Sequence, residues 1–223
     1  MNSVSTAGAA APVEAARARL LRSGLRLFAQ QGYAKTSTRE LAEDAGVNVA
    51  SISYYFGDKA GLYRAVFFEP MGSPQDDIAR FGVPGLSLPQ ALAGLYDAFL
   101  EPLKQGDTAR LCMKLHFREM LEPTGLWEEE IAHGIRPMHE ALLAVLCRHF
   151  GLAEADDELQ RLAVCIAGLG VHMHVGYDVV QQLAPRLHEG ADALDLWAER
   201  LVSYALAMIN AEHARRAAQP EAA

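Results

Sequence analysis

Hydrophobic residues recur along most of the chain at the three-to-four-residue spacing of amphipathic helices, and strand-like alternation is hard to find. Between Arg17 and Gln31 the apolar side chains make one broad stripe, and Gly32 follows as a helix stop. Further helices are expected over residues 60–69, 88–104, 108–121, 126–150, 156–183 and 191–214. Clusters of Gly and Pro separate these segments. The pattern therefore predicts an all-α protein.

A short helix is predicted to begin at Thr38. Ser37, followed three residues later by Glu40, has the capping-box spacing in which side chains satisfy the free amides of a first helical turn. Gly46 interrupts this helix after about two turns. Asn48 is then a second N-cap, which opens another helix over residues 49–56. Two short helices joined through a glycine turn are typical of a helix-turn-helix.

The second of these helices is predicted to present an uncharged outer face. A helix turns about 100° per residue, so an inward Ile52 directs the residues around it outward. The outward positions are Ala50, Ser53 and Tyr54, with Val49 and Ser51 on the flanks. A helix that enters a DNA major groove presents such a face to base edges and phosphates.

Cations for DNA binding must therefore come from outside that helix. Arg39, at the start of the first helix, is the one side chain expected to make a bidentate contact with guanine. Lys59, Lys35, Arg17 and the exposed helix N-terminus at Thr38 are the expected phosphate partners.

These residues carry a family resemblance. The run Ser53-Tyr54-Tyr55-Phe56-Gly57-Asp58-Lys59, followed by Leu62-Tyr63, resembles the end of the DNA-binding signature of TetR-family transcriptional regulators, and the likeness covers residues 15–65. The stretch from Arg118 to Thr124 resembles, more loosely, the CecR-like group. The resemblance implies a homodimer, a double-stranded DNA operator with two half-sites, and a C-terminal domain that binds a small-molecule inducer.

The resemblance also assigns DNA-contacting positions. Together with the cap residue Asn48, the predicted set is Thr38, Arg39, Asn48, Val49, Ala50, Ser51, Ser53, Tyr54, Tyr55 and Lys59. Many family members carry Thr-Leu-Tyr where this chain has Ser51-Ile52-Ser53. The tyrosine usually found at position 53 is therefore missing.

Composition adds a division of charge. The net charge of −8 over 223 residues argues, as a total, against a nucleic-acid partner. Residues 1–70 nevertheless hold eight basic and six acidic residues, a net +2, which leaves −10 for the rest. This asymmetry favours an anion-binding head on an acidic body. Three widely spaced cysteines exclude a disulfide scaffold and a cysteine zinc site, and they suit a cytoplasmic protein.

Four segments are predicted. Residues 1–12 read as a disordered tail, 13–60 as the helix-turn-helix domain, 61–216 as a helical ligand-binding and dimerisation domain, and 217–223 as a second tail. The apolar run from Leu162 to Tyr177 falls short of the roughly 20 residues that cross a bilayer, so no membrane segment is expected. A hinge is expected near Pro70, where the helix that joins the two domains is predicted to break.

The inducer site is predicted less sharply. A ligand pocket is mostly apolar with a few polar groups aimed inward. The residues that fit this description are Met113, His116, Phe117, Met120, Trp127 and His172. For each of them taken singly, a satisfied position in the core is the favoured alternative. His172 and His174 are two residues apart and point to different helix faces, so neither a metal site nor a cofactor is predicted.

The leading interpretation is a homodimeric, ligand-responsive transcriptional regulator, more often a repressor than an activator. The helices over Pro137–Phe150 and Leu162–Tyr177 are the expected dimerisation elements. A small-molecule-binding helical protein without sequence-specific DNA reading is the alternative, because the recognition helix is uncharged. Arg118, Glu119 and His116 lie within one helical turn, but no nucleophile–base pair accompanies them, so an enzyme is not predicted.

Overall fold

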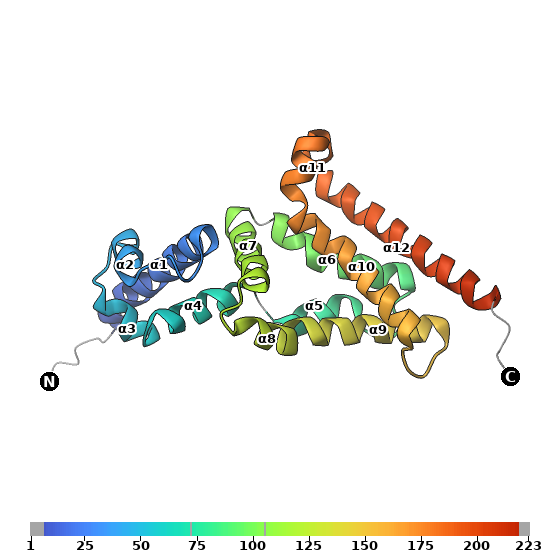
Figure 1. The fold of residues 1–223 in the computed structure, drawn as a ribbon, viewed down its shortest axis with the longest axis horizontal. Coiled ribbons are helices and arrows are strands. Elements are labelled where there is room, and N and C mark those ends of the chain that lie inside the picture. Colours follow the sequence, from blue (N-terminus) through green and yellow to red (C-terminus); the bar gives the residue numbers. More distant parts are fainter. Residues whose placement is uncertain (1–6, 72, 105, 219–223) are drawn as a thin grey trace. The chain divides into compact units, whose positions relative to one another are not determined.

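The computed structural model describes residues 7–71, 73–104 and 106–218, and these form helices joined by short turns, without a strand (Figure 1). The all-α prediction is confirmed. Contacts between the helices divide the chain into two compact units. Unit 1 comprises residues 1–72 and 107–127, and unit 2 comprises residues 73–106 and 128–223.

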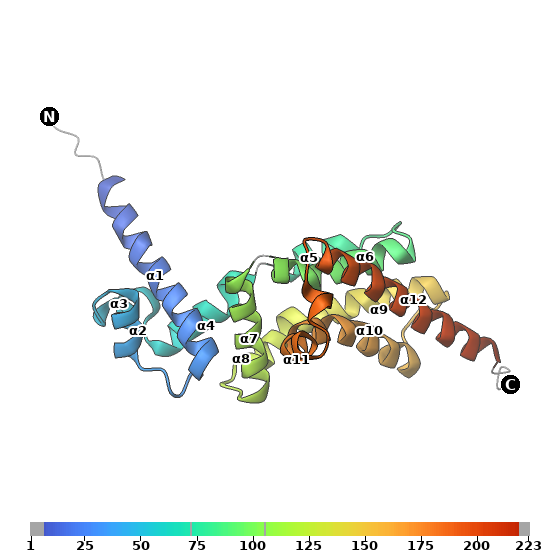
Figure 2. The same ribbon diagram turned by 90° about the horizontal axis from the view of Figure 1, so that it is seen from above.

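Unit 1 contains five α-helices and one short 3₁₀ turn. They are α1 (Ala7–Gln31), α2 (Thr38–Ala45), α3 (Ala50–Phe56), α4 (Lys59–Phe68), η1 (Glu69–Met71) and α7 (Asp107–Leu121). In both ribbon views α2 and α3 lie side by side, and α1 packs against α2, α3 and α4 (Figures 1 and 2). α7 packs on α1 and α4 from a later part of the chain.

The core of unit 1 forms because each helix turns one apolar stripe inward. The fully buried positions include Phe28 of α1, Leu41 of α2, Ile52 of α3 and Phe67 of α4. From α7, Leu115 joins this core without any exposed surface. α7, which begins 39 residues after the end of α4, therefore completes the hydrophobic core of the helix-turn-helix.

Unit 2 is a bundle of longer helices. Its elements are α5 (Pro74–Phe81), α6 (Leu88–Lys104), α8 (Leu126–Glu130), η2 (Ile131–Ile135), α9 (Arg136–Phe150), α10 (Asp157–Val175), α11 (Tyr177–Leu183), η3 (Pro185–His188) and α12 (Ala193–Ala218). The first two residues of α8 are counted with unit 1. α6 packs on α5, α10 and α12, and α9 packs on α5 and α10 (Figure 2). Leucines and other apolar side chains fill the space between these helices.

Two predicted helices are interrupted and one helix is additional. The expected helix over 126–150 contains a π-helical turn at Ile131–Ile135, and the one over 156–183 bends by 71° beside Gly176. α5 stands where the sequence pattern predicts only breakers. Ser73 caps it, accepting a hydrogen bond from the amide of Gln75, and Pro74 suits its first turn, so the breakers are in fact a helix start.

The ends of the chain and the unit boundaries differ from the predicted segments. α1 begins at Ala7, so residues 7–12 are helical where the sequence predicts a tail, consistent with the high helix propensity of their alanines. α12 extends to Ala218, while residues 1–6 and 219–223 of the predicted tails lie outside the described residues. Contacts place all of α4 with the helix-turn-helix, and they add α7 to it.

In the part of the chain that the structure describes, no single helix has both the length and the hydropathy of a membrane span. α10 and α11 reach that threshold only when the bent pair is taken together.

Candidate nucleic-acid interface

The two helices of the predicted motif form as their cap residues require. The Ser37 hydroxyl accepts a hydrogen bond from the Glu40 amide at 3.1 Å, which satisfies one free donor of the first turn of α2. The Asn48 side chain accepts one from the Ala50 amide at 2.9 Å, just before α3, whose N-cap residue is Val49. The predicted helix start at Thr38 is therefore confirmed, and α3 begins at Ala50, one residue later than predicted.

The turn between the helices depends on a left-handed glycine. Gly46 has φ 62°, a conformation that a side chain would strain, and its amide closes the end of α2 on the carbonyls of Ala42 and Glu43. The Val47 amide also reaches the carbonyl of Ala42, at 2.9 Å. These bonds fix the direction in which the chain enters α3.

α3 presents the face that the sequence predicts. Ile52 is buried, while Ala50, Ser53 and Tyr54 are exposed, Tyr54 to 77%. Val49 lies exposed at the start of this face. The outward surface of α3 is thus apolar and hydroxyl-bearing, with no charged side chain.

The remaining predicted side chains of α3 lie between its exposed face and the core of unit 1. Ser51 and Tyr55 are half-buried, and the Tyr55 ring packs on the core of unit 1. The rings of Tyr54 and Tyr55 meet edge to face with centroids 4.8 Å apart. Tyr55 therefore supports the orientation of Tyr54 as well as bordering the exposed face.

Lys59 holds the helix-turn-helix together. Its ammonium donates to the backbone carbonyls of Tyr33 and Thr36, both at 2.8 Å, and it lies 4.2 Å from the centre of the Tyr33 ring. These contacts join the start of α4 to the loop between α1 and α2. The ammonium is thus already engaged by two carbonyls and one aromatic ring, and its phosphate contact stays a prediction.

Gly61 lets α4 begin directly after α3. A Cβ atom added at Gly61 would stand 1.9 Å from the carbonyl oxygen of Phe56, closer than atoms can approach. Asp58 caps the same turn, accepting a hydrogen bond from the Gly61 amide at 2.8 Å. The short connection over residues 57–61 therefore sets the angle between α3 and α4.

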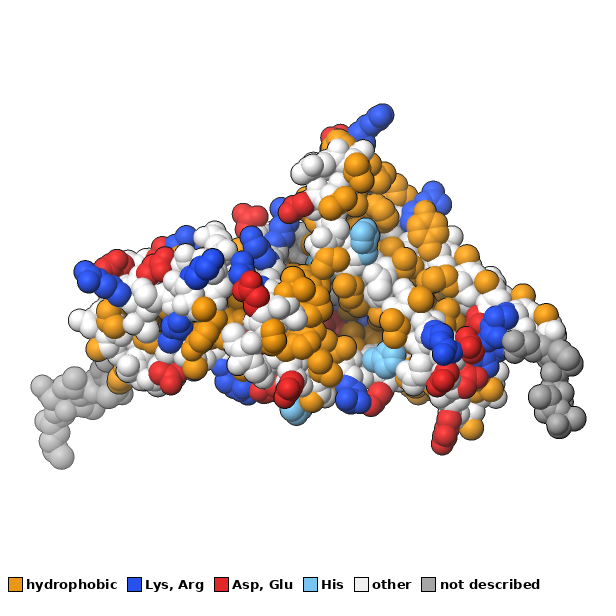
Figure 3. All heavy atoms as spheres, viewed as in Figure 1, with side chains coloured by type: hydrophobic (Ala, Val, Ile, Leu, Met, Phe, Trp, Pro, Cys, Tyr) orange, Lys and Arg blue, Asp and Glu red, His pale blue; other side chains and the backbone are white. Residues whose placement is uncertain are grey.

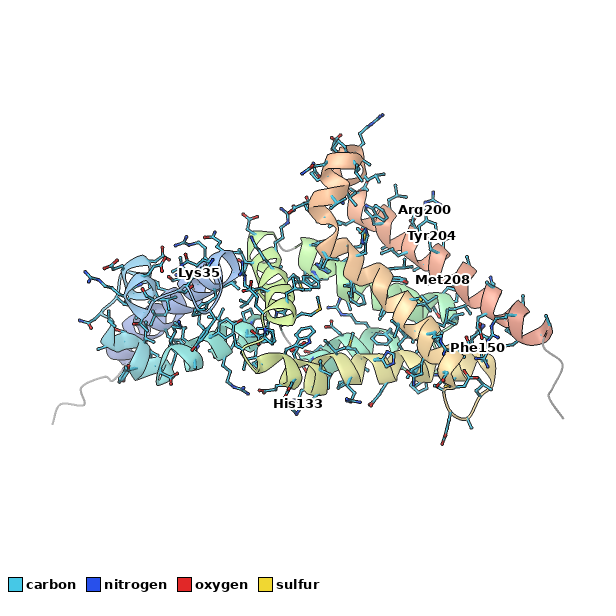
Figure 4. The ribbon with its side chains drawn as sticks, in the orientation of Figure 1. Lys35, His133, Phe150, Arg200, Tyr204 and Met208 are labelled. Carbon is cyan, nitrogen blue, oxygen red and sulfur yellow. The ribbon has the colours of Figure 1, made fainter. Side chains whose placement is uncertain are left out.

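The predicted cations differ in how free they are. Arg39 has 84% of its side chain exposed and pairs only with Glu43, one turn along α2, at 2.9 Å. Lys35 is exposed in the loop before α2 (Figure 4). Arg17 is engaged with Glu69 at 2.5 Å and lies over the Phe56 ring. Arg39 and Lys35 are thus the more available donors for an anionic partner.

A basic groove beside α2 is an element that sequence reasoning did not single out. Arg19, Arg22 and Arg26 follow one face of α1 at helical spacing, and with Ser23, Asp44 and Ala45 they line a cleft of about 290 Å³. Arg19 donates to the carbonyl of Ala45 at 3.0 Å, and Arg26 pairs with Asp44. Two of these arginines therefore fasten α1 to the end of α2. Their i, i+3, i+7 spacing was the available signal.

α7 contributes buried polar groups that the sequence did not assign to this unit. Glu119 is completely buried and accepts a hydrogen bond from the Tyr63 hydroxyl at 2.7 Å. His116 is 7% exposed, stacks on Phe67 with ring centroids 3.9 Å apart, and contacts the carbonyl of Cys112 at 2.9 Å. Burial lowers the pKa of His116, which favours the neutral ring.

The six predicted ligand residues are not gathered at one place. Five of them fall in unit 1, where Met113, Phe117 and Trp127 are half-buried and Met120 is exposed, while His116 is part of the packed core. His172 belongs to unit 2 and is exposed. A second cleft in unit 1, of about 280 Å³, is lined by Tyr33, Ala34, Tyr63, Arg118, Glu122, Pro123 and Thr124. The six residues line neither of the two clefts, and their role in ligand binding stays a prediction.

A capped two-helix motif with an exposed, uncharged second helix and free cations at its edge defines a helix-turn-helix protein. Comparison with known families agrees with this class. The model of bacterial regulatory proteins of the tetR family matches residues 20–66, and the C-terminal domain of the HTH-type transcriptional dual regulator CecR matches residues 88–212. The chain belongs to the TetR family of transcriptional regulators and carries a CecR-type C-terminal domain.

Individual relatives support the same assignment. The HTH-type transcriptional dual regulator CecR of Shigella flexneri is 30% identical over 155 residues, which cover 65% of this chain and 68% of that protein. The probable HTH-type transcriptional regulator YttP of Bacillus subtilis is 48% identical over 51 residues, 23% of this chain and 25% of that protein. These proteins are transcriptional regulators, so the prediction that the chain is not an enzyme is confirmed.

Solved structures share the fold. A tetR-family regulatory protein from Rhodococcus RHA1 matches with a TM-score of 0.64 and 21% identity, over 87% of this chain and 96% of that one. HlyIIR, a hemolysin II transcriptional regulator, matches with a TM-score of 0.59 and 20% identity, over 86% and 97%. NalD, the secondary repressor of the MexAB-OprM multidrug efflux pump in Pseudomonas aeruginosa, matches with a TM-score of 0.56 and 18% identity, over 88% and 97%.

Proposed function

We propose that this regulator is a cytoplasmic repressor that binds a double-stranded operator as a homodimer and leaves it when a small molecule binds. The observation that carries the proposal is the exposed face of α3, formed by Ala50, Ser53 and Tyr54, together with Arg39, whose side chain is 84% exposed and paired with Glu43 on the surface. Hydroxyl groups and small apolar side chains read base edges and thymine methyl groups, and Arg39 reads guanine. Two such helices would dock in major grooves about 34–36 Å apart.

We place the dimer face on unit 2. α12 buries Leu201, Ala205 and Ile209 within the unit, and Met208 packs partly against the same core, whereas Arg200 and Tyr204 are exposed (Figure 4). The half-exposed or more exposed apolar side chains of α10 and α12 are Val164, Val175, Leu196 and Tyr204. Hydrophobic side chains also gather over α11 and the first half of α12 (Figure 3). Contiguous apolar surface of this kind marks protein interfaces.

α10 fits the dimer role better than α9. Leu142, Leu143, Val145 and Leu146 of α9 are buried in the core of unit 2. α10 also has a buried face, yet it keeps the valines at 164 and 175 outside. Of the two predicted dimerisation stretches, the one at Leu162–Tyr177 therefore has exposed apolar side chains that a second subunit could cover.

Release by a small molecule is the finer part of the proposal. A ligand lowers operator affinity only if it binds the released form more tightly than the operator-bound form. The repressor role and the ligand response follow family precedent, and NalD is one relative whose name describes a repressor. The hinge at Pro70 belongs to this proposal: α4 ends at Phe68, and the 3₁₀ turn that contains Pro70 follows it.

The test starts from genomic DNA. Fragments bound by the purified wild-type chain are selected and sequenced, and the enriched fragment serves as the operator for all later measurements. Replacing Arg39 with Ala should weaken binding to this operator by about 1–3 kcal/mol if the guanidinium reads a base. Binding to random duplex DNA should change much less.

A matched control comes from unit 2. Arg161 is also an exposed helix arginine and pairs with Glu158 at 2.8 Å, but it lies on the acidic part of the chain. Arg161→Ala should leave operator binding unchanged. Equal losses on operator and random DNA in Arg39→Ala would assign that side chain to phosphate alone. A wild-type chain that enriches no fragment would favour the alternative, a ligand-binding protein without sequence-specific DNA reading.

A further inference from the structure

The most unusual group in unit 1 is the carboxylate of Glu119. It comes from α7 and has no exposed surface, although a charged side chain is rarely buried without compensation. The compensation is a set of neutral donors around it. The Thr124 amide donates at 2.7 Å, the Thr124 hydroxyl at 3.0 Å, and the Leu126 amide at 3.1 Å.

The fourth donor connects α7 to α4. The Tyr63 hydroxyl, 56 positions earlier in the chain, donates to the second carboxylate oxygen at 2.7 Å. Burial, and then the hydrogen bond to Glu119, raise the pKa of the Tyr63 phenol far above its usual range, so the phenol keeps its proton and remains a donor. One carboxylate therefore holds together the end of α7, the turn that follows it, and the middle of α4.

From Tyr63 the contacts continue to the start of α4. The Tyr63 ring lies 4.9 Å from the Tyr33 ring, whose centre lies 4.2 Å from the Lys59 ammonium. Lys59 follows the last residue of α3 by three positions and donates to carbonyls of the α1–α2 loop. A chain of packed groups thus joins Glu119 to the first residue of α4, the helix on which α3 packs.

The course of the chain gives these contacts a regulatory meaning. Residues 107–127 belong to unit 1, whereas the segments before and after them belong to unit 2. The matched CecR-type domain, residues 88–212, also includes α7. The segment that carries Glu119 is therefore joined covalently to unit 2 at both of its ends.

We infer that Glu119 is a positioning residue for DNA binding: its hydrogen bonds to Tyr63 and to the 124–126 turn lock α7 onto α4 in the operator-binding arrangement. This inference rests on the proposed function and names the device that would regulate it. Breaking the lock leaves the residues of α3 unchanged but loosens the orientation in which they are presented. A carboxylate serves better than an apolar side chain here, because its four directed bonds fit one arrangement only.

The test compares two conservative tyrosine variants. Tyr63→Phe removes only the hydroxyl that reaches Glu119. Tyr96→Phe removes an equally buried hydroxyl in unit 2, which donates to the carbonyl of Ile166 at 3.1 Å. Operator and random-duplex affinities are measured for both variants, using the fragment enriched by the wild-type chain and versions of it whose half-site spacing differs by one base pair.

Tyr63→Phe should weaken operator binding by between about 2-fold and 30-fold, the range of coupling through a packed network. It should also reduce the preference for the native half-site spacing, while random-duplex affinity stays at the wild-type value. Two ratios are compared: operator affinity to random-duplex affinity, and affinity for the native spacing to affinity for the altered spacings. Tyr96→Phe should change neither of these ratios, even if the melting temperature of the variant falls. A merely structural role of Tyr63 would move the melting temperature and leave both ratios in place.

A second variant keeps the inference falsifiable. Thr124→Val removes another hydroxyl donor to Glu119 from an exposed turn. It should act in the same direction as Tyr63→Phe, and the double variant should lose less than the product of the two single losses, because both act through one carboxylate. If both single variants keep the two affinity ratios of the wild-type chain, the inference about Glu119 is overturned, while the proposed function stands. Failure of the wild-type chain to enrich any DNA would overturn the proposed function and, with it, this inference.

Discussion

The two units of this regulator differ in what their cores contain. Among the described residues, the buried polar or charged side chains are Ser23, Thr36, His116 and Glu119, and all four belong to unit 1. Unit 2 buries a larger set of apolar side chains. Tyr96 places a hydroxyl in that core, with the carbonyl of Ile166 as its partner.

This difference suits the two tasks that we propose for the units. Directed hydrogen bonds are satisfied in one arrangement and cost free energy in others, so a polar core specifies a single geometry. Apolar contacts are less directional and tolerate repacking when volume is conserved. A surface that reads DNA needs a fixed recognition helix, whereas a domain that responds to a small molecule needs alternative packings of similar free energy.

The largest expected effect compares one phenylalanine from each core. Phe67 in α4 and Phe81 in α5 are both completely buried. Truncating either to Ala should destabilise its unit by about 3–5 kcal/mol through lost burial and the cavity left behind. The two tryptophans report the units separately, since Trp127 belongs to unit 1 and Trp197 to unit 2.

The measurement is urea unfolding followed by fluorescence in single-tryptophan backgrounds, with the other tryptophan replaced by Phe. Phe67→Ala should move the Trp127 transition more than the Trp197 transition, and Phe81→Ala should do the reverse. If both variants shift both transitions equally, the units unfold as one body and the contrast between them has no separate thermodynamic meaning.

Much of unit 1 could be predicted because its instructions are local. Ser37, Gly46 and Asn48 act within four residues of the backbone groups that they satisfy, so a short stretch of sequence contains the complete signal. The inward position of Ile52 then fixes the exposed face of α3 by rotation alone. The exposed face of α3 follows from few residues, so the sequence alone predicts it.

The remaining features depend on distant partners. Nothing adjacent to Glu119 in sequence reveals that Tyr63 lies 2.7 Å away, or that α7 joins the core of unit 1. The bend beside Gly176 and the start of α5 at Pro74 were obscured because glycine and proline mark helix starts and bends as well as breaks. The ligand residues were the least predictable, since a pocket requires several helices to converge.

Two mid-helix glycines provide the next comparison. Gly24 in α1 is buried, and a Cβ atom there would lie 2.8 Å from a methyl carbon of Val66 in α4. Gly168 in α10 is exposed, and a Cβ atom there would meet nothing within 4 Å. Gly24→Ala should therefore destabilise unit 1 by about 1–3 kcal/mol through overpacking, while Gly168→Ala should stabilise unit 2 by about 0.5–1 kcal/mol.

The same single-tryptophan unfolding experiment measures both glycine variants. A lower free energy of unfolding in Gly24→Ala and a higher one in Gly168→Ala would support a close approach of α1 and α4 in unit 1 and an open position at Gly168 in unit 2. A loss of stability in Gly168→Ala would contradict the open position and would instead place Gly168 in close contact across the proposed dimer face of α10, on which Val164 and Val175 also lie.

The smallest expected effect is a difference in acid sensitivity, and two histidines test it. His116 in unit 1 is stacked on Phe67, and His174 in unit 2 contacts the carbonyl of Phe99 at 2.8 Å. Burial lowers the pKa of both rings below the ordinary value of 6.5, more than their backbone contacts raise it. Each ring is thus held neutral in the fold at a pH at which the unfolded chain already binds a proton.

The stabilising contribution of each neutral ring is therefore complete above pH 6.5, the pKa of the ring in the unfolded chain. The free energy of unfolding should fall as the pH drops below this value. His116→Phe should flatten this fall in the Trp127 transition between about pH 7 and pH 5, and His174→Phe should do so in the Trp197 transition. His116 is the more deeply buried ring, so its replacement should have the larger effect, and unit 1 should be the more acid-sensitive unit. Equal pH profiles in wild type and His116→Phe would show that acid acts on unit 1 through other groups.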